Sequence, residues 1–134
     1  MTKEEKIKYW VELSYRDLQT ADTLVNGGHY LWAGFMCHQV IEKIFKGYYS
    51  ALLDETPPYI HDLRILAVKA DFWKNLSDEQ QLQILELIPL QIEARYPEYK
   101  NQLAQALTEQ KCRQIFENTK LLLEWTKEKI LLEK

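Results

Sequence analysis

The sequence predicts an all-α protein, an antiparallel up-and-down bundle of four to five helices in a single domain spanning residues 1–134. Three observations support this class. The chain has 134 residues, of which 46% are hydrophobic and 12% aromatic, enough for a sizeable core. Only four Gly and four Pro leave few places for turns. Long stretches place apolar residues three and four positions apart, the period of one helix face.

The stretch 30–53 should form the central helix. Its apolar residues repeat at helical spacing, at Tyr30, Ala33, Cys37, Val40, Ile41, Ile44, Phe45 and Tyr48. A patch of small residues at Ala33, Gly34 and Cys37 would let a second helix, which we take to be the first helix of the chain, approach closely. Glu42, Lys43 and Lys46 bring charge beside the apolar stripe, so this junction is where we expect function.

The first helix should run from about residue 3 to residue 25. Its predicted inner face comprises Ile7, Trp10, Val11, Ser14, Leu18, Ala21, Leu24 and Val25. Asn26-Gly27-Gly28 is a strong helix terminator, and the short gap to Tyr30 makes the first two helices antiparallel neighbours.

The middle of the chain is broken by prolines. Pro57 and Pro58 should force a turn before a short helix over about 61–70. Ser77, followed three residues later by Gln80, is a capping-box pattern that starts another helix. We expect that element to kink or restart at Pro89 and to end at Pro97.

The segment 97–107 is polar and mixed, and should form at most a loose helical turn. Thr108 is suited to cap the last helix, which should reach nearly to the C-terminus with Cys112, Ile115, Phe116, Thr119, Leu122, Leu123 and Ile130 inward. Cys37 and Cys112 both occupy apolar positions, which favours two reduced buried thiols over a disulfide.

Composition also limits the functional class. Seventeen basic and twenty acidic side chains give a formal charge of -3, which argues against a protein coated in positive charge for non-specific nucleic-acid binding. No run approaches the roughly 18 uncharged residues of a membrane helix. We therefore expect a cytoplasmic protein that does not contact a membrane.

Several motifs, in order, resemble the HEPN domains (higher eukaryotes and prokaryotes nucleotide-binding). They are WVELSYRDLQTADTL from Trp10 to Leu24, Gly28-His29-Tyr30 followed by Ala33-Gly34-Phe35, His38-Gln39-Val40-Ile41-Glu42-Lys43 with Lys46, His61-Asp62-Leu63 after a proline-containing loop, and Arg95-Tyr96-Pro97. Each string is weak alone, but their order and spacing cover about a hundred residues. The resemblance implies a four- or five-helix bundle, often a homodimer, that is commonly encoded beside a minimal nucleotidyltransferase with which it forms a toxin and antitoxin pair.

The chain departs from the nuclease branch of this family. Those members carry an Arg followed four to six residues later by a His on the last long helix, and here no His follows His61. Arg95 and Arg113 therefore have no such partner. Because metal-independent RNA cleavage needs a general acid or base beside a phosphate-binding cation, the departure argues against catalysis by the usual motif.

The candidate ligand-binding residues are Arg95, Tyr96, His61, Lys43 and Lys46. Arg95 supplies a forked donor for phosphate and Tyr96 a flat surface for a base. The alternative is that Tyr96 fills a gap between helices while Arg95 pairs with Glu93 or Glu98. His61 could meet a ligand or bond the preceding loop, and the two lysines could attract phosphate or line a solvated face.

No cofactor or metal is expected. His38 and Glu42 share a helix face, but one such pair supplies too few ligands, and no Glu is followed three residues later by His, as di-iron bundles require.

Three functional hypotheses follow. The first is a non-catalytic HEPN-like protein that binds a nucleotide or RNA and works with a nucleotidyltransferase partner. The second is a homodimeric interaction module without a ligand, using exposed aromatic residues among Trp32, Trp73, Tyr48 and Tyr49. The third is a ribonuclease that uses a different set of residues.

Overall fold

The computed structural model describes residues 1–92 and 95–133, which form a helical bundle. This confirms the predicted all-α class. The described residues contain six α-helices and two short 3₁₀ helices. In chain order these are α1 (Lys3–Asn26), α2 (Tyr30–Leu53), α3 (Leu63–Lys69), η1 (Trp73–Asn75), α4 (Asp78–Leu87), η2 (Ile88–Leu90), α5 (Pro97–Ala106) and α6 (Glu109–Leu132).

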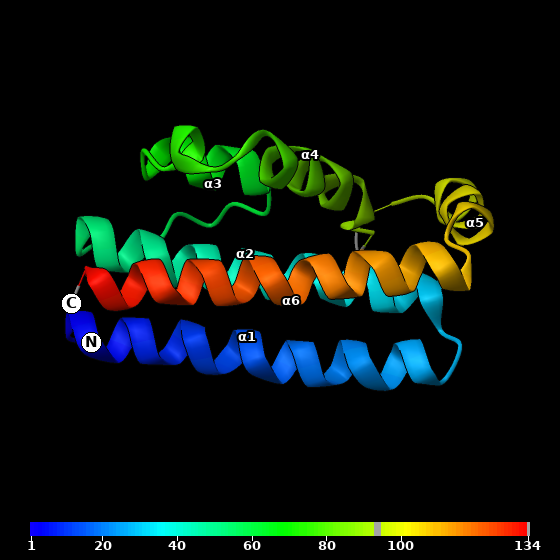
Figure 1. Cartoon of the computed structure of the whole chain (residues 1–134), viewed down its shortest axis with the longest axis horizontal. Helices are drawn as coiled ribbons and strands as arrows, with labels where there is room; N and C mark the ends of the chain where they lie inside the picture. The colour runs from blue at the N-terminus through cyan, green and yellow to red at the C-terminus, as the bar shows by residue number, and fades with distance from the viewer. Residues whose placement is uncertain (93–94, 134) are drawn as a thin grey trace.

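Helices α1 and α2 form the predicted antiparallel hairpin (Figure 1). Thr2 and Glu5 make a capping box that starts α1. The turn into α2 passes through Gly28, whose φ of 81° lies in the left-handed region that favours glycine. The two helices approach each other closely at Gly47, where an added Cβ would lie 3.3 Å from Cβ of Trp10.

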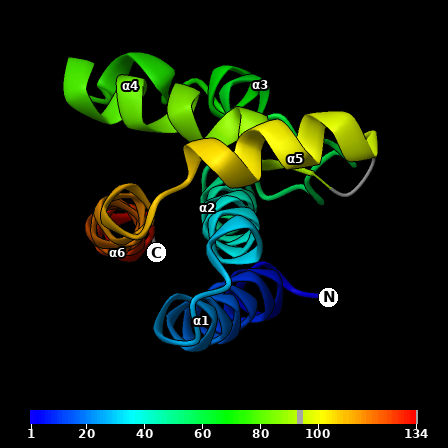
Figure 2. The same ribbon diagram turned by 90° about the vertical axis from the view of Figure 1, so that its right-hand side faces the viewer.

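Helix α6 packs against α2 and completes the bundle of three long helices. It runs in the same direction as α2, so only α1 is antiparallel to its neighbours (Figure 1). The sulfhydryl of Cys112 near the start of α6 lies 3.7 Å from the carbonyl oxygen of Tyr30 at the start of α2, in agreement with this direction. The reason is the α3–α5 segment, which carries the chain back along the bundle before α6 begins. Helices α3 and α4 lie above α2, and α5 crosses one end (Figure 2).

The small-residue patch on α2 serves a different contact from the one we expected. A Cβ added at Gly34 would lie 3.2 Å from Cδ1 of Leu107 and 3.3 Å from Cδ1 of Leu90. Gly34 therefore admits η2 and the link between α5 and α6, and it is Gly47 that admits α1. Sequence spacing identified a close approach but could not tell which element makes it.

The region between the prolines also differs from expectation. The Ser77 capping box is present, but α4 ends at Leu87, and Pro89 lies inside η2 instead of kinking a continuing helix. Pro97 does not end an element. It stands in the first turn of α5, where its missing N–H costs no hydrogen bond, and α5 then extends for ten residues.

Both thiols are buried and free, as predicted. Burial raises the pKa of Cys37 to about 12, so this thiol stays protonated. Within residues 1–92 and 95–133, no helix combines the length and the apolar composition needed to cross a bilayer.

Candidate functional site

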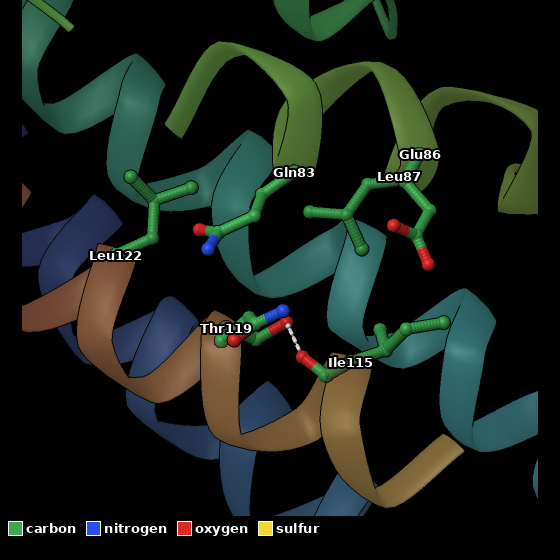
Figure 3. A pocket seen from close by; sticks show the side chains of 7 residues that line it. Gln83, Glu86, Leu87, Ile115, Thr119 and Leu122 are labelled. Carbon is green, nitrogen blue, oxygen red and sulfur yellow. Dashed lines mark hydrogen bonds between the residues drawn. The ribbon is translucent and has the colours of Figure 1, made fainter. Parts of the chain in front are cut away.

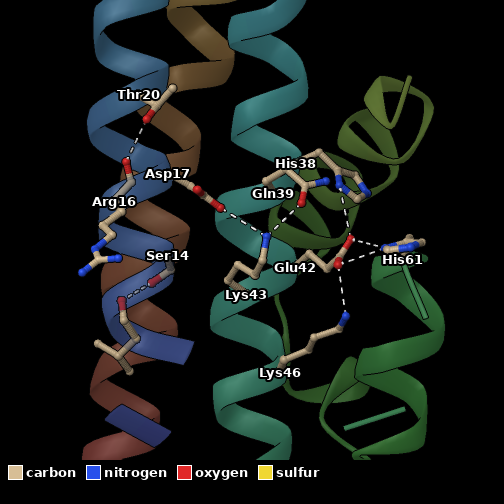
Figure 4. A network of polar contacts seen from close by, with 11 residues as sticks. Ser14, Arg16, Asp17, Thr20, His38, Gln39, Glu42, Lys43, Lys46 and His61 are labelled. Atoms are coloured by element: carbon tan, nitrogen blue, oxygen red, sulfur yellow. Dashed lines mark hydrogen bonds and ion pairs between the residues drawn. The ribbon is translucent and has the colours of Figure 1, made fainter. Parts of the chain in front are cut away.

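Glu42 on α2 is the centre of a buried polar cluster. Its side chain is 2% exposed, and Nδ1 of His61, in the loop before α3, lies 3.1 Å from each carboxylate oxygen. Nζ of Lys46, one turn further along α2, donates to Oε2 at 3.1 Å. The carboxylate thus receives hydrogen bonds from two directions, which offsets the cost of burying its charge (Figure 4).

His38 lies on the same face of α2, one turn before Glu42, and is completely buried. Its Nδ1 is 3.8 Å from Oε1 of Glu42, and within the described residues neither ring nitrogen has a hydrogen-bond partner. Burial lowers the pKa of His38 to about 4, although the Glu42 carboxylate opposes this change. His38 is therefore neutral at physiological pH.

Aromatic rings cover the outer side of the cluster. The ammonium of Lys46 lies 5.5 Å from the ring centre of Trp10 on α1 and 5.8 Å from that of Tyr59. The Tyr59 ring also meets the His61 ring edge to face at 5.4 Å. Lys46 is 5% exposed, so its charge is held inside the fold by Glu42 and these rings.

His61 leads from this cluster to an open pocket. The pocket has a volume of about 300 Å³ and is lined by His61, Asp62, Ile88, Gln91 and Arg95. Two of the sequence-predicted residues, His61 and Arg95, therefore face the same space although they are far apart in the sequence. Nδ1 of His61 is engaged by Glu42, so any proton exchange with a ligand would take place at Nε2.

Arg95 is held at the edge of this pocket by neutral groups. Its Nε donates to the Gln91 carbonyl at 3.2 Å, and its guanidinium lies 4.9 Å from the ring centre of Tyr99 on α5. Of the two carboxylates considered as alternative partners, Glu93 lies outside the described residues, and Arg95 forms no ion pair with Glu98 in the described part of the chain. Tyr96 is 83% exposed and does not fill a gap between helices.

Lys43 belongs to a different part of the molecule. Its ammonium donates to Asp17 of α1 at 3.2 Å and to Gln39 at 2.9 Å, on the side of α2 that faces α1 (Figure 4). It lines a second hollow, together with Trp32 and Lys100. The five predicted residues therefore divide: His61 and Arg95 share a pocket, Lys46 lies behind His61, Tyr96 points to solvent, and Lys43 serves the second hollow.

Sequence reasoning understated the role of Glu42. The sequence pattern places it beside Lys43 and Lys46 and on one helix face with His38, whereas the structure makes it the group that holds both His61 and Lys46. The available indication was a carboxylate one turn before a lysine on a helix with a long run of apolar residues. Its pairing with His61 depends on how the proline-containing loop folds back over α2.

The convergence of His38, Glu42 and His61 does not amount to a metal centre. Within the described residues, no group of three or more His, Cys, Asp or Glu side chains is arranged to hold a metal ion. Lys46 already supplies the positive charge beside the carboxylate.

A smaller hollow between α4 and α6 is visible in Figure 3, with Gln83 and Leu87 facing Ile115 and Leu122. It offers about 10 Å³, roughly the room that one water needs. It is too small for a nucleotide.

A family model of the HEPN domain matches residues 7–130, nearly the whole length of the sequence. The chain belongs to the HEPN family. This confirms the resemblance drawn from the sequence motifs.

A solved structure agrees with this assignment at the level of the fold. The HEPN chain is similar to TT1696 from Thermus thermophilus, whose crystal structure superposes with a TM-score of 0.79 at 20% sequence identity. The match covers 92% of this chain and 98% of the other. A comparison with curated proteins gave no match.

Proposed function

We propose that this HEPN protein binds a nucleotide or an RNA end in the pocket lined by His61 and Arg95, and that it is not itself catalytic. The observation that carries the proposal is the meeting of these two side chains at one open pocket of about 300 Å³. The volume is at the small end of the range for ligand sites, which suits a phosphate group and part of a nucleoside.

The chemistry of the pocket fits a phosphate ester. Arg95 can present two parallel N–H donors to phosphate oxygens, and its contacts within residues 1–92 and 95–133 are to a carbonyl and a ring, neither of which carries a negative charge. His61 is oriented by Glu42, so that Nε2 can serve the ligand. Tyr96, exposed beside Arg95, offers a flat ring on which a base could stack.

The partner in this proposal is a minimal nucleotidyltransferase, in a cytoplasmic toxin and antitoxin pair, and the HEPN protein acts as a homodimer. The family assignment supports this, because such pairing and dimerisation are common among HEPN domains. Trp32 and the half-exposed Tyr9 offer aromatic surface to a partner. Of the other candidates for such a face, Trp73 is partly buried, and Tyr48 and Tyr49 are buried in the core.

A ribonuclease is a second candidate, favoured by one specific observation. A histidine backed by a carboxylate, sharing a pocket with an arginine, is an arrangement that can move a proton and hold a phosphate. Growth arrest on expression that disappears in His61→Ala would support this candidate over simple binding.

The binding proposal is tested by thermal-shift titration with AMP, ATP and short RNAs, followed by isothermal titration of any ligand that stabilises the protein. Arg95→Ala should weaken binding by about tenfold or more, because a charged hydrogen bond contributes roughly 1.5–3 kcal/mol. Arg113→Ala is the matched control, since Arg113 pairs with Glu109 on α6, outside the pocket.

The proposal that this pocket binds the ligand would be refuted if no ligand stabilised the protein, or if Arg95→Ala bound a ligand as tightly as the natural protein. A concentration-dependent dimer without ligand binding would then favour the interaction module.

A further inference from the structure

The second hollow lies between α1, α2 and α5 and is separate from the His61–Arg95 pocket. It has a volume of about 420 Å³ and is lined by Asp17 from α1, by Trp32, Phe35, Met36, Gln39 and Lys43 from α2, and by Lys100 from α5. It shares no lining residue with the first pocket. Three helices from distant parts of the sequence thus contribute to it.

An indole ring forms one wall of the hollow. Trp32 is 47% exposed although it lies in the first turn of the central helix. Its ring is held from one side by an edge-to-face contact with Phe35, with the centroids 6.0 Å apart and an interplanar angle of 87°. The neighbouring Met36 extends the apolar surface, so a planar ring entering the hollow would meet an aromatic side chain with a fixed orientation.

The two lysines that line the hollow differ in whether their charge is neutralised. Lys43 is neutralised by Asp17 at 3.2 Å, and Gln39 accepts a second hydrogen bond from its ammonium. Lys100 lies over the Trp32 ring, 5.7 Å from its centre, and in the part of the chain that the structure describes it forms no ion pair with a carboxylate. The lining therefore carries one net positive charge, placed beside the aromatic wall.

We propose that this hollow binds a flat aromatic ring that carries one anionic group, with the ring against Trp32 and the anion at Lys100. A purely apolar ligand would bind poorly, because it would exclude water from the polar side chains of Asp17, Gln39 and Lys43. A ligand with several negative charges would also bind poorly, because the hollow offers only one cation that is not paired with a carboxylate in the described part of the chain. The anion can be a phosphate or a carboxylate, because an ammonium accepts either as a point charge. This site goes beyond the proposed function and does not depend on it.

The test uses the full-length protein and two probes, AMP and indole-3-acetate, with adenosine and inorganic phosphate as probes that lack one of the two features. Isothermal titration gives the affinity, and quenching of tryptophan fluorescence reports stacking. AMP or indole-3-acetate should bind saturably and more tightly than adenosine or phosphate. Binding of AMP alone identifies a phosphate site, and binding of indole-3-acetate alone a carboxylate site.

Variants locate the binding. Trp32→Ala and Lys100→Ala should each weaken it by about tenfold, and Trp32→Phe should keep binding while losing the fluorescence change. Lys129→Ala is the matched control, because Lys129 covers Trp125 in the same way on α6 but does not line the hollow. Arg95→Ala should leave this site intact, which separates it from the first pocket.

The proposal is overturned if neither charged probe binds at concentrations up to about 1 mM, or if binding is unaffected in both Trp32→Ala and Lys100→Ala. Because the Lys100 side chain is only partly buried, Lys100→Ala should fold normally and give a decision even if Trp32→Ala proves unstable.

Discussion

Acidification should destabilise the protein through His38. In the unfolded chain this imidazole has an ordinary pKa near 6.5, whereas burial in the fold lowers its pKa to about 4. Between pH 6.5 and pH 4 the unfolded state therefore binds more protons than the folded state, so the free energy of unfolding must fall as the pH falls through this window. The two pKa values differ by about 2.5, and each pKa unit corresponds to about 1.4 kcal/mol, so the total loss is about 3–4 kcal/mol.

The measurement is urea denaturation at pH 7, 5.5 and 4 for the natural protein and for His38→Gln. Other groups also titrate in this range, so the informative quantity is the difference between the two pH dependences. Glu42 and the backbone of His61 favour protonation of His38, whereas the charges of His61 and Lys43 disfavour it, so the measured difference reports the balance of these groups. Parallel pH dependences in the two proteins would refute the view that His38 is buried and neutral.

Three further predictions concern packing and charge. Glu42→Ala should lower the free energy of unfolding by about 3–5 kcal/mol, because it leaves the Lys46 ammonium buried without its carboxylate. Urea denaturation measures this change. A loss below about 1 kcal/mol would mean that the Lys46 ammonium reaches solvent. Gly34→Leu should cost about 1–3 kcal/mol or more, because its side chain meets two leucine methyl groups, and Gly34→Ala should cost less; equal midpoints for both variants and the natural protein would contradict this contact. Cys37 and Cys112 should react with a thiol reagent at pH 8 only as fast as the protein unfolds, and fast labelling of the native protein would show that the thiols are accessible.

Much of the bundle could be predicted because the relevant information is local. The helical period and the residues that cap helices act within a few positions of the chain. Helix α1 ends at the glycines after Asn26, and α4 and α6 begin at the capping residues Ser77 and Thr108, as expected. Prediction failed around Pro97, because a proline that ends one element and a proline that starts the next look alike in sequence.

The candidate site was predictable only in part. His61 and Arg95 were identified as chemically able to hold an anion, but nothing in their spacing indicated that they share a pocket. The sequence grouped Lys43 with Lys46, yet a helix turns by about 100° per residue, so side chains three apart can face different neighbours. In the fold Lys43 meets α1 and Lys46 meets the loop before α3.

The sequence by itself determined the all-α class, the first two helices, the reduced state of the thiols and membership of the HEPN family, because these depend on periodicity, caps and motif order. Only the tertiary structure decided that Glu42 holds His61 and Lys46, that Gly34 admits Leu90 and Leu107, and that α5 brings Lys100 over Trp32. Each of these is a contact between segments far apart in the chain, and long-range contacts are fixed by how the helices pack together.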